Sequence, residues 1–233
     1  MKKMYDGTYI EWEVDRQSGS WKEKMQKIAY GIEQFKAYYD NHDIPAAVLR
    51  DKGVPIDEVV YESRYADLLV VDAGYSPGKD AARTPTTFIE ELLTKAECPV
   101  IIAPDDFKGV EEIVFAWDGS ASATFAIKQF TYLLPELREK KVSIIQVRED
   151  ERDRGAAKQR LSEWLSNYYT HVGWDELDGP VNAVLLEYCL GKKGAFVVFG
   201  AYGRSMMSRF FQRSRAEQVI RTVAQPFFIA HHS

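Results

Sequence analysis

Two stretches of the sequence carry the same ordered set of features, and this repeat limits the possible fold more than any other property of the chain. Residues 57–104 and 181–231 each contain an amphipathic helix pattern, a short apolar run, a turn with glycines, a second helix pattern and an apolar run entered through a proline. Aligning Pro99 with Pro226 gives an offset of 226 − 99 = 127 residues. That offset is too long for a solenoid repeat and suits a domain, so duplication is the simplest explanation.

The apolar runs have the pattern of strands that are buried on both faces. They are continuous rather than alternating, and helix patterns separate them, as a parallel sheet covered by helices on both faces requires. In the second half, strand patterns at 113–117 and 142–147 alternate with helix patterns at 122–134 and 156–169, and a third strand near Trp174 is poorly marked. The sequence therefore predicts an α/β fold with Rossmann-like parallel sheets.

The first half begins late relative to the second. A strand pattern at 9–14 precedes a helix pattern at 21–39, and another strand pattern follows at 46–49. Subtracting the offset from Asp118 gives 118 − 127 = −9, a position before Met1. The first half is therefore predicted to lack its first strand and helix, either because its start is truncated or misassigned or because a site has been lost. The turn-rich stretch at 104–110 separates two predicted domains, 1–106 and 107–233.

Charge and composition argue against several classes of function. The net charge is −5 and the basic residues are scattered among acidic ones, so nucleic acid is not expected as the partner. The chain has no run of about 18 apolar residues and no apolar leader segment, so we expect a cytoplasmic protein without a membrane partner. Cys98 and Cys189 lack metal-ligand spacing and the four histidines form no cluster, so no metal site is predicted.

Several motifs of the second half follow one another in a fixed order. An apolar strand runs into Asp118-Gly119-Ser120, the segment 199–205 reads Phe-Gly-Ala-Tyr-Gly-Arg-Ser, and the helix pattern at 214–220 leads to the closing strand after Pro226. Each piece alone is common in α/β proteins, but their order, spacing and residue types agree together. In this respect the second half resembles the universal stress protein family along nearly its whole length. The resemblance implies two domains of the adenine nucleotide alpha hydrolase type, the first one incomplete.

The resemblance also points to a glycine loop. Members of the family that bind ATP use Gly, two residues, Gly, nine residues, and then Gly followed by Ser or Thr. Gly200, Gly203 and Ser214 match this spacing, with Arg204 directly after the second glycine, whereas Arg213 replaces the third glycine. Glycines at such a turn let backbone N–H groups approach phosphate oxygens, and the following helix start adds the positive end of its dipole. Arg213 either binds a phosphate bidentately or fills the space of the phosphates, and the sequence leaves both interpretations open.

The loop after the first strand of the second half is the other candidate site segment. Asp118 matches the family position that contacts the adenine or ribose end of the nucleotide, with Gly119 and Ser120 beside it. An Asp that caps the turn through Gly119 explains the same residue equally well, and Ser120 fits a helix start. The resemblance implies ATP or a related adenine nucleotide as the ligand, with Mg²⁺ bound only together with the nucleotide.

The corresponding loop of the first half, 72–78, keeps glycines without the family spacing, so we expect no nucleotide there. In the family, halves or subunits often associate through their last strands. The resemblance therefore implies association of the two halves, or a homodimer, through 100–102 and 227–229, although both segments also fit ordinary buried strands.

Three functions are compatible with these patterns. The first is a stress-response protein whose second domain binds an adenine nucleotide through the modified loop. The second is a stress protein that binds no nucleotide and acts as a dimeric interaction module, which Arg213 and the missing first strand of the first half favour. The third is an enzyme such as a weak ATPase, which ranks last because the sequence carries no general base, Walker lysine or metal-ligand constellation.

Overall fold

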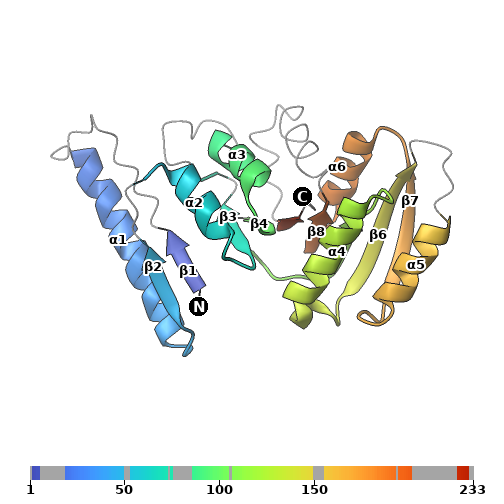
Figure 1. The fold of residues 1–233 in the computed structure, drawn as a ribbon, viewed down its shortest axis with the longest axis horizontal. Helices are drawn as coiled ribbons and strands as arrows, with labels where there is room; N and C mark the ends of the chain where they lie inside the picture. The colour runs from blue at the N-terminus through green and yellow to red at the C-terminus, as the bar shows by residue number, and fades with distance from the viewer. Residues whose placement is uncertain are drawn as a thin grey trace. The chain divides into compact units, whose positions relative to one another are not determined.

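A computed structural model gives the arrangement of the helices and strands (Figure 1). The predicted α/β class is confirmed, because parallel strands alternate with helices along most of the chain. The structure describes residues 2–5, 19–49, 53–72, 74–75, 86–104, 107–148, 155–192, 194–200 and 225–230.

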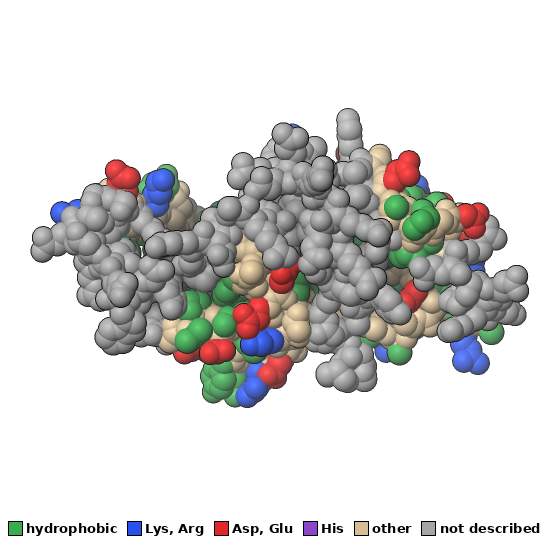
Figure 2. Space-filling model, turned by 90° about the horizontal axis from the view of Figure 1, so that it is seen from above, with side chains coloured by type: hydrophobic (Ala, Val, Ile, Leu, Met, Phe, Trp, Pro, Cys, Tyr) green, Lys and Arg blue, Asp and Glu red, His purple; other side chains and the backbone are tan. Residues whose placement is uncertain are grey.

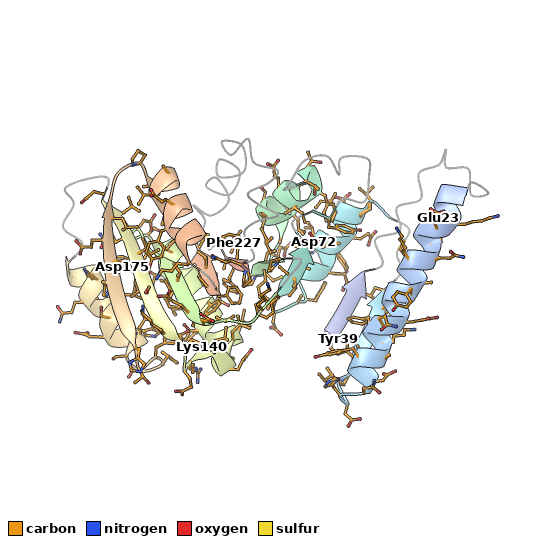
Figure 3. All side chains as sticks on the ribbon, turned by 180° about the vertical axis from the view of Figure 1, so that it is seen from behind. Glu23, Tyr39, Asp72, Lys140, Asp175 and Phe227 are labelled. Carbon is orange, nitrogen blue, oxygen red and sulfur yellow. The ribbon has the colours of Figure 1, made fainter. Side chains whose placement is uncertain are left out.

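The second half forms a five-stranded parallel arrangement. Its order along the sheet is β9-β8-β5-β6-β7, and every neighbouring pair within it runs parallel. Helix α4 covers the face turned to the viewer in Figure 1, and α6 lies on the other face, seen in Figure 3. The elements are β5 (Glu112–Ala116), α4 (Ala121–Leu133), the 3₁₀ turn η1 (Pro135–Leu137), β6 (Lys141–Arg148), α5 (Gly155–Leu165), β7 (Val172–Asp178), α6 (Val181–Gly191), β8 (Ala195–Phe199) and β9 (Phe227–Ile229).

The four described strands of the first half belong to two different sheets. Strands β1 and β2 pair in parallel as a two-stranded sheet, whereas β3 and β4 belong to the seven-stranded sheet with the order β3-β4-β9-β8-β5-β6-β7. The elements are β1 (Lys2–Tyr5), α1 (Gly19–Asp40), β2 (Ala46–Leu49), α2 (Pro55–Ser63), β3 (Leu69–Asp72), α3 (Thr87–Lys95) and β4 (Val100–Ala103).

Apart from α3, whose counterpart would fall on residues that are not described, the elements of the two halves correspond when they are counted from their last strands. β4 then matches β9, β3 matches β8, α2 matches α6, β2 matches β7, α1 matches α5 and β1 matches β6. In the described part of the chain, nothing in the first half matches β5 and α4, the first strand and helix of the second half. The strand predicted at 9–14 lies outside the described residues.

Strands β4 and β9 join the halves into one sheet. They pair antiparallel, with Val100 opposite Ile229, Ile101 opposite Phe228 and Ile102 opposite Phe227. The two residues of the central pair are separated by 228 − 101 = 127 positions, which is the offset of the repeat. In each outer pair, the first residue of one strand lies opposite the last residue of the other, as two-fold symmetry between the two strands requires. Because β4 and β9 run in opposite directions, the carboxyl ends of β3 and β4 lie beside the amino ends of the strands of the second half.

The chain divides into two compact units, 1–61 and 62–233. The seven-stranded sheet lies in the second unit and has strands on both sides of residue 106, where the sequence predicted a domain boundary. The domain boundary between residues 106 and 107 remains a prediction, because the compact units divide between residues 61 and 62 instead. Within the described residues, no helix is long and apolar enough to cross a membrane.

Aromatic rings fill the core between α4 and the sheet. Phe130 of α4 makes edge-to-face contacts with Phe115, Phe196 and Phe228, at ring-centroid distances of 5.7, 4.9 and 5.3 Å. Such contacts add to the free energy of apolar burial. The core therefore ties the central strands β5, β8 and β9 to α4, the helix whose first turn borders the candidate site.

Candidate functional site

The candidate site lies where β5 and β8 end side by side. From β5 the chain passes through α4 to β6 on one side, whereas β8 leads toward β9 on the other side. This reversal of strand order is the position at which open α/β sheets bind ligands. The loops that carry Asp118 and Gly200 begin here, so the fold brings the two predicted loop segments together.

The loop after β5 is a capped turn. The Oδ1 atom of Asp118 accepts a hydrogen bond from the Ser120 N–H at 2.9 Å, and Gly119 adopts a positive φ of 84° that suits glycine. Ser120 is the N-cap of α4, because its Oγ accepts a hydrogen bond from the Ala123 N–H at 3.1 Å. The capping interpretation of Asp118 and Ser120 is thus realised, while Asp118 remains exposed to solvent.

Gly200 lies against the first turn of α4. A Cβ atom at this position would lie 2.5 Å from the Ala123 nitrogen, 2.7 Å from its Cα and 2.7 Å from the Ser122 carbonyl carbon. Those atoms belong to the helix backbone and have no side-chain freedom to move away. Close packing of β8 against α4 therefore explains the glycine at 200, a role that the sequence had assigned to phosphate clearance.

Trp117 packs beneath the capped turn after β5, and it was not identified from the sequence. Its side chain is 3% exposed and its indole Nε1–H donates to Thr124 Oγ1 at 3.2 Å. Thr124 Oγ1 in turn donates to the Ser120 carbonyl at 3.0 Å, which ties Trp117 to the capped turn. The alternation of Ile113, Phe115 and Trp117 on one face of the strand is the sequence signal that could have identified it.

Trp117 also contacts a second indole on the edge strand β7. The two rings of Trp117 and Trp174 meet edge to face at 5.3 Å, and Trp174 donates its Nε1–H to Ser162 Oγ at 3.0 Å. Lys158 lies over the Trp174 ring at 4.6 Å and pairs with Glu176 at 2.6 Å. A buried indole directly before Asp118 provides a spectroscopic reporter for this corner of the molecule.

The other predicted site residues cannot be placed. Gly203, Arg204, Arg213 and Ser214 lie outside the described residues. The structure therefore brings together Asp118, Gly119, Ser120 and Gly200. Within the described ranges, no group of three His, Cys, Asp or Glu side chains could hold a metal ion.

The described ends of the loop after β3, the counterpart in the first half, make hydrogen bonds of their own. Asp72 Oδ1 accepts from the Gly74 N–H at 2.6 Å, and the Tyr75 carbonyl accepts from Thr86 Oγ1 at 2.5 Å. The fully buried Thr86 also caps α3 by accepting from the Ile89 N–H at 3.3 Å. Because β3 is antiparallel to β8, this loop and Asp118 lie beyond opposite ends of the strands of the sheet.

A buried carboxylate anchors the amino ends of the strands. Glu112, the first residue of β5, accepts hydrogen bonds from Ser143 Oγ at 2.5 Å and Lys192 Nζ at 2.8 Å, and pairs with Lys141 at 3.2 Å. Burial alone would raise the pKa of Glu112, but these three donors outweigh it and hold the pKa below its usual value. This cluster could not be predicted from the sequence, because its members lie up to 80 residues apart.

Tyr188 and Asp175 extend the cluster toward the edge of the sheet. The Tyr188 hydroxyl donates to Asp175 Oδ2 at 2.6 Å, and Lys192 lies over the Tyr188 ring at 4.8 Å. Asp175 is labelled on β7 in Figure 3. The group connects β5, β6, β7 and the end of α6 through side chains of the sheet, and it includes none of the residues in the loops after β5 and β8.

Comparisons with known proteins identify the fold. A universal stress protein from Archaeoglobus fulgidus DSM 4304 superposes with a TM-score of 0.69 at 18% sequence identity, covering 100% of this chain and 87% of that chain. A functionally unknown protein from Pseudomonas aeruginosa PAO1 superposes with a TM-score of 0.53 at 12% identity, covering 99% of this chain and 92% of its own. No known family model and no curated protein matches the sequence. The chain therefore has the fold of a universal stress protein.

Proposed function

We propose that the chain is a stress-response protein of the universal stress protein type, and that the loops after β5 and β8 bind ATP or a related adenine nucleotide. The observation that carries the proposal is the meeting of these loops at the reversal of strand order, where Gly200 lies against α4 next to the exposed Asp118. The proposed role is binding, with Mg²⁺ entering only as part of the nucleotide complex.

Asp118 has two roles in this proposal. One carboxylate oxygen accepts a hydrogen bond from the Ser120 N–H, and the exposed carboxylate contacts the ribose or adenine end of the nucleotide. Asp118→Asn keeps an oxygen that can accept from the Ser120 N–H but removes the charge, whereas Asp118→Ala removes both. Weaker ATP binding in both variants supports direct contact, while a loss confined to Asp118→Ala assigns the residue to the turn alone.

Arg213 separates the two interpretations of the modified loop. If its side chain fills the phosphate space, Arg213→Gly restores the third glycine and increases ATP affinity. If its guanidinium binds a phosphate, the same change decreases affinity. Lys at this position keeps the charge but loses the bidentate geometry, so Arg213→Lys serves as the matched variant.

The test is a titration with ATP and Mg²⁺, followed by tryptophan fluorescence and by melting temperature. A ligand that binds only the folded protein raises the melting temperature by mass action. Trp117 lies directly before Asp118, so a bound nucleotide should change the emission. Unchanged emission and melting temperature at millimolar ATP would overturn the nucleotide proposal.

The second candidate function is an interaction module, and the β4–β9 pairing bears on how such a module would associate. β4 pairs with β3 and β9, and β9 pairs with β4 and β8, so both last strands have two neighbours within one chain. We propose that association through the last strands occurs between the halves of one chain rather than between two chains. A protein that forms a homodimer only while β4 and β9 are intact would contradict this assignment.

A further inference from the structure

Three aromatic rings meet at the surface where α4 and α5 end. Tyr132 lies in the last turn of α4, Trp164 in the last turn of α5 and Tyr168 in the turn that follows α5. The Tyr132 ring contacts the Trp164 and Tyr168 rings edge to face at centroid distances of 5.9 and 6.0 Å, and those two rings lie 4.7 Å apart. Tyr132 is 48% exposed and the other two rings are half-buried, so the cluster presents aromatic surface to solvent.

Two cations lie beside the Tyr168 ring. Arg138 belongs to the turn between η1 and β6, two residues before Lys140, which is labelled in Figure 3. The guanidinium carbon of Arg138 lies 5.2 Å from the centroid of the Tyr168 ring. Hydrogen bonding with Tyr132 and burial raise the pKa of the Tyr168 hydroxyl, whereas the charges of Arg138 and Lys128 oppose this rise. Lys128 therefore also lies close to Tyr168.

A third cation comes from α5. Arg160 is exposed and precedes Trp164 by one turn of the helix, a spacing that places both residues on the same helix face. Lys128 is likewise exposed and precedes Tyr132 by one turn of α4. We call Lys128, Tyr132, Arg138, Arg160, Trp164 and Tyr168 the aromatic–basic surface. All six residues belong to the second compact unit.

The three cations of this surface have no acidic partner among the described residues. Helix α4 contains no acidic residue, and Glu163, the acid of α5, accepts a hydrogen bond from Gln159 at 2.9 Å. Other lysines of the second half pair with Glu112 and Glu176. On the face drawn in Figure 2, acidic and basic side chains both occur over the described part, and neither sign forms a continuous patch there. The aromatic–basic surface thus differs in leaving its positive charges unpaired.

Arg138 also has an unused hydrogen-bond donor. Its Nε atom is buried, and no described residue accepts a hydrogen bond from it. The acids Glu136 and Glu139 flank Arg138 in the sequence, but within the described chain neither forms an ion pair with it. Buried donors in native proteins nearly always have a partner, because an unpaired donor costs free energy. A carboxylate fits an arginine well, since its two oxygens match two N–H groups of the planar guanidinium.

These features together define the occupant. Unpaired cations attract anionic groups, and tyrosine, tryptophan and arginine are the residues that contribute most to protein interfaces. Nucleic-acid bases stack on open ring faces, whereas these rings contact one another, and the net charge of −5 repels a phosphate backbone. We propose that the aromatic–basic surface binds an acidic segment of a partner protein, with carboxylates on the three cations and an aromatic side chain against Tyr132. The surface includes no residue of the loops after β5 and β8, so the proposal does not depend on nucleotide binding.

Binding of a defined acidic polymer to the 233-residue protein tests the proposal. The probe is a fluorescently labelled random copolymer of glutamate and tyrosine, followed by anisotropy at low salt. We expect it to bind at least about threefold more tightly than polyglutamate, which offers the charges without the rings. In spectra of the ¹⁵N-labelled protein, the indole signal of Trp164, assigned by its loss in Trp164→Phe, should shift more than that of Trp117, which is 3% exposed.

Matched variants locate the contact. Lys128→Glu should weaken binding at least about fivefold, whereas Lys36→Glu, the same change at an exposed lysine of α1, should leave it unchanged. Tyr132→Ala should weaken binding by about tenfold, whereas Tyr30→Ala, at a tyrosine of α1 that is 64% exposed, should not. The melting temperature of each variant shows whether it is folded.

Three results would overturn the proposal. The first is the absence of copolymer binding at low salt. The second is binding that Lys128→Glu and Lys36→Glu weaken equally, or that leaves the Trp164 indole signal unshifted, since the polymer would then bind elsewhere. The third is tighter binding of a single-stranded oligothymidylate than of the copolymer, with the same loss in Tyr132→Ala, which would assign the surface to nucleic acid.

Discussion

Replacing Gly200 by alanine separates the packing role of this residue from a role in phosphate binding. The added Cβ would lie 2.5 Å from the Ala123 nitrogen, and two further backbone atoms of α4 lie at 2.7 Å. The first turn of α4 cannot shift freely, because the Ser120 side chain caps it and Thr124 ties it to Trp117. The strand end at Gly200 is itself buried, so neither partner can relax toward solvent.

The expected cost is that of overpacking a rigid site. Extra methyl or methylene groups in a well-packed core cost about 1–3 kcal/mol, and contact with three backbone atoms of α4 places Gly200→Ala at roughly 3 kcal/mol. For a protein of this size, 1 kcal/mol lowers the melting temperature by about 2–4 °C, so the variant should melt about 6–12 °C lower.

Thermal and urea unfolding measure the change directly. Gly173→Ala is the control, because its nearest atom is the Val142 carbonyl oxygen at 3.9 Å, an ordinary contact. A loss of less than about 1 kcal/mol in Gly200→Ala would refute the packing argument. If ATP affinity fell while stability remained unchanged, the phosphate-clearance interpretation of Gly200 would be correct instead.

Three further predictions concern the rest of the second compact unit. Glu112 has a pKa below its usual value of 4.5, so its contribution to stability is complete above that pH and is lost as the pH falls through the lower folded-state pKa. Glu112→Gln should flatten the pH dependence of unfolding below about pH 4.5, and an unchanged acid limb would contradict this. Phe228→Asp, in the middle of the β4–β9 pairing, should cost at least about 3 kcal/mol by cavity and charge burial, and a wild-type urea midpoint would count against it. Burial raises the pKa of the Cys189 thiol to about 12, so it should react with a disulfide reagent only after unfolding, whereas rapid reaction in the native protein would show that the site opens.

Strand and helix positions could be predicted where the hydrophobic pattern was local. The segment predicted at 46–49 coincides with β2, and the continuous apolar runs correspond to β3, β4, β8 and β9. β7 was poorly marked because it is an edge strand in which Gly173, Asp175 and Glu176 interrupt the apolar pattern. Its existence depends on pairing with β6, which the sequence around it does not encode.

The site was only partly predictable for a similar reason. Asp118 and Ser120 could be identified because a capped turn uses neighbouring residues. Gly200 was identified for a different reason from the one that its packing gives, since Ala123 approaches it from a helix far away in sequence. Glu112 was not singled out from the sequence, and its partner Lys192 directly follows the end of α6. Such long-range contacts leave no local pattern to read.

The division of the chain into compact units follows from the strand order of the fold. In the second half, β5 lies between β6 and β8 and joins the two sides of the sheet. Among the described strands of the first half none corresponds to β5, and β1 and β2 form a sheet of their own. The division at Tyr61 falls within α2, the helix that connects the two sides. β4 pairs with β9, so β3 and β4 belong to one sheet with the strands of the second half.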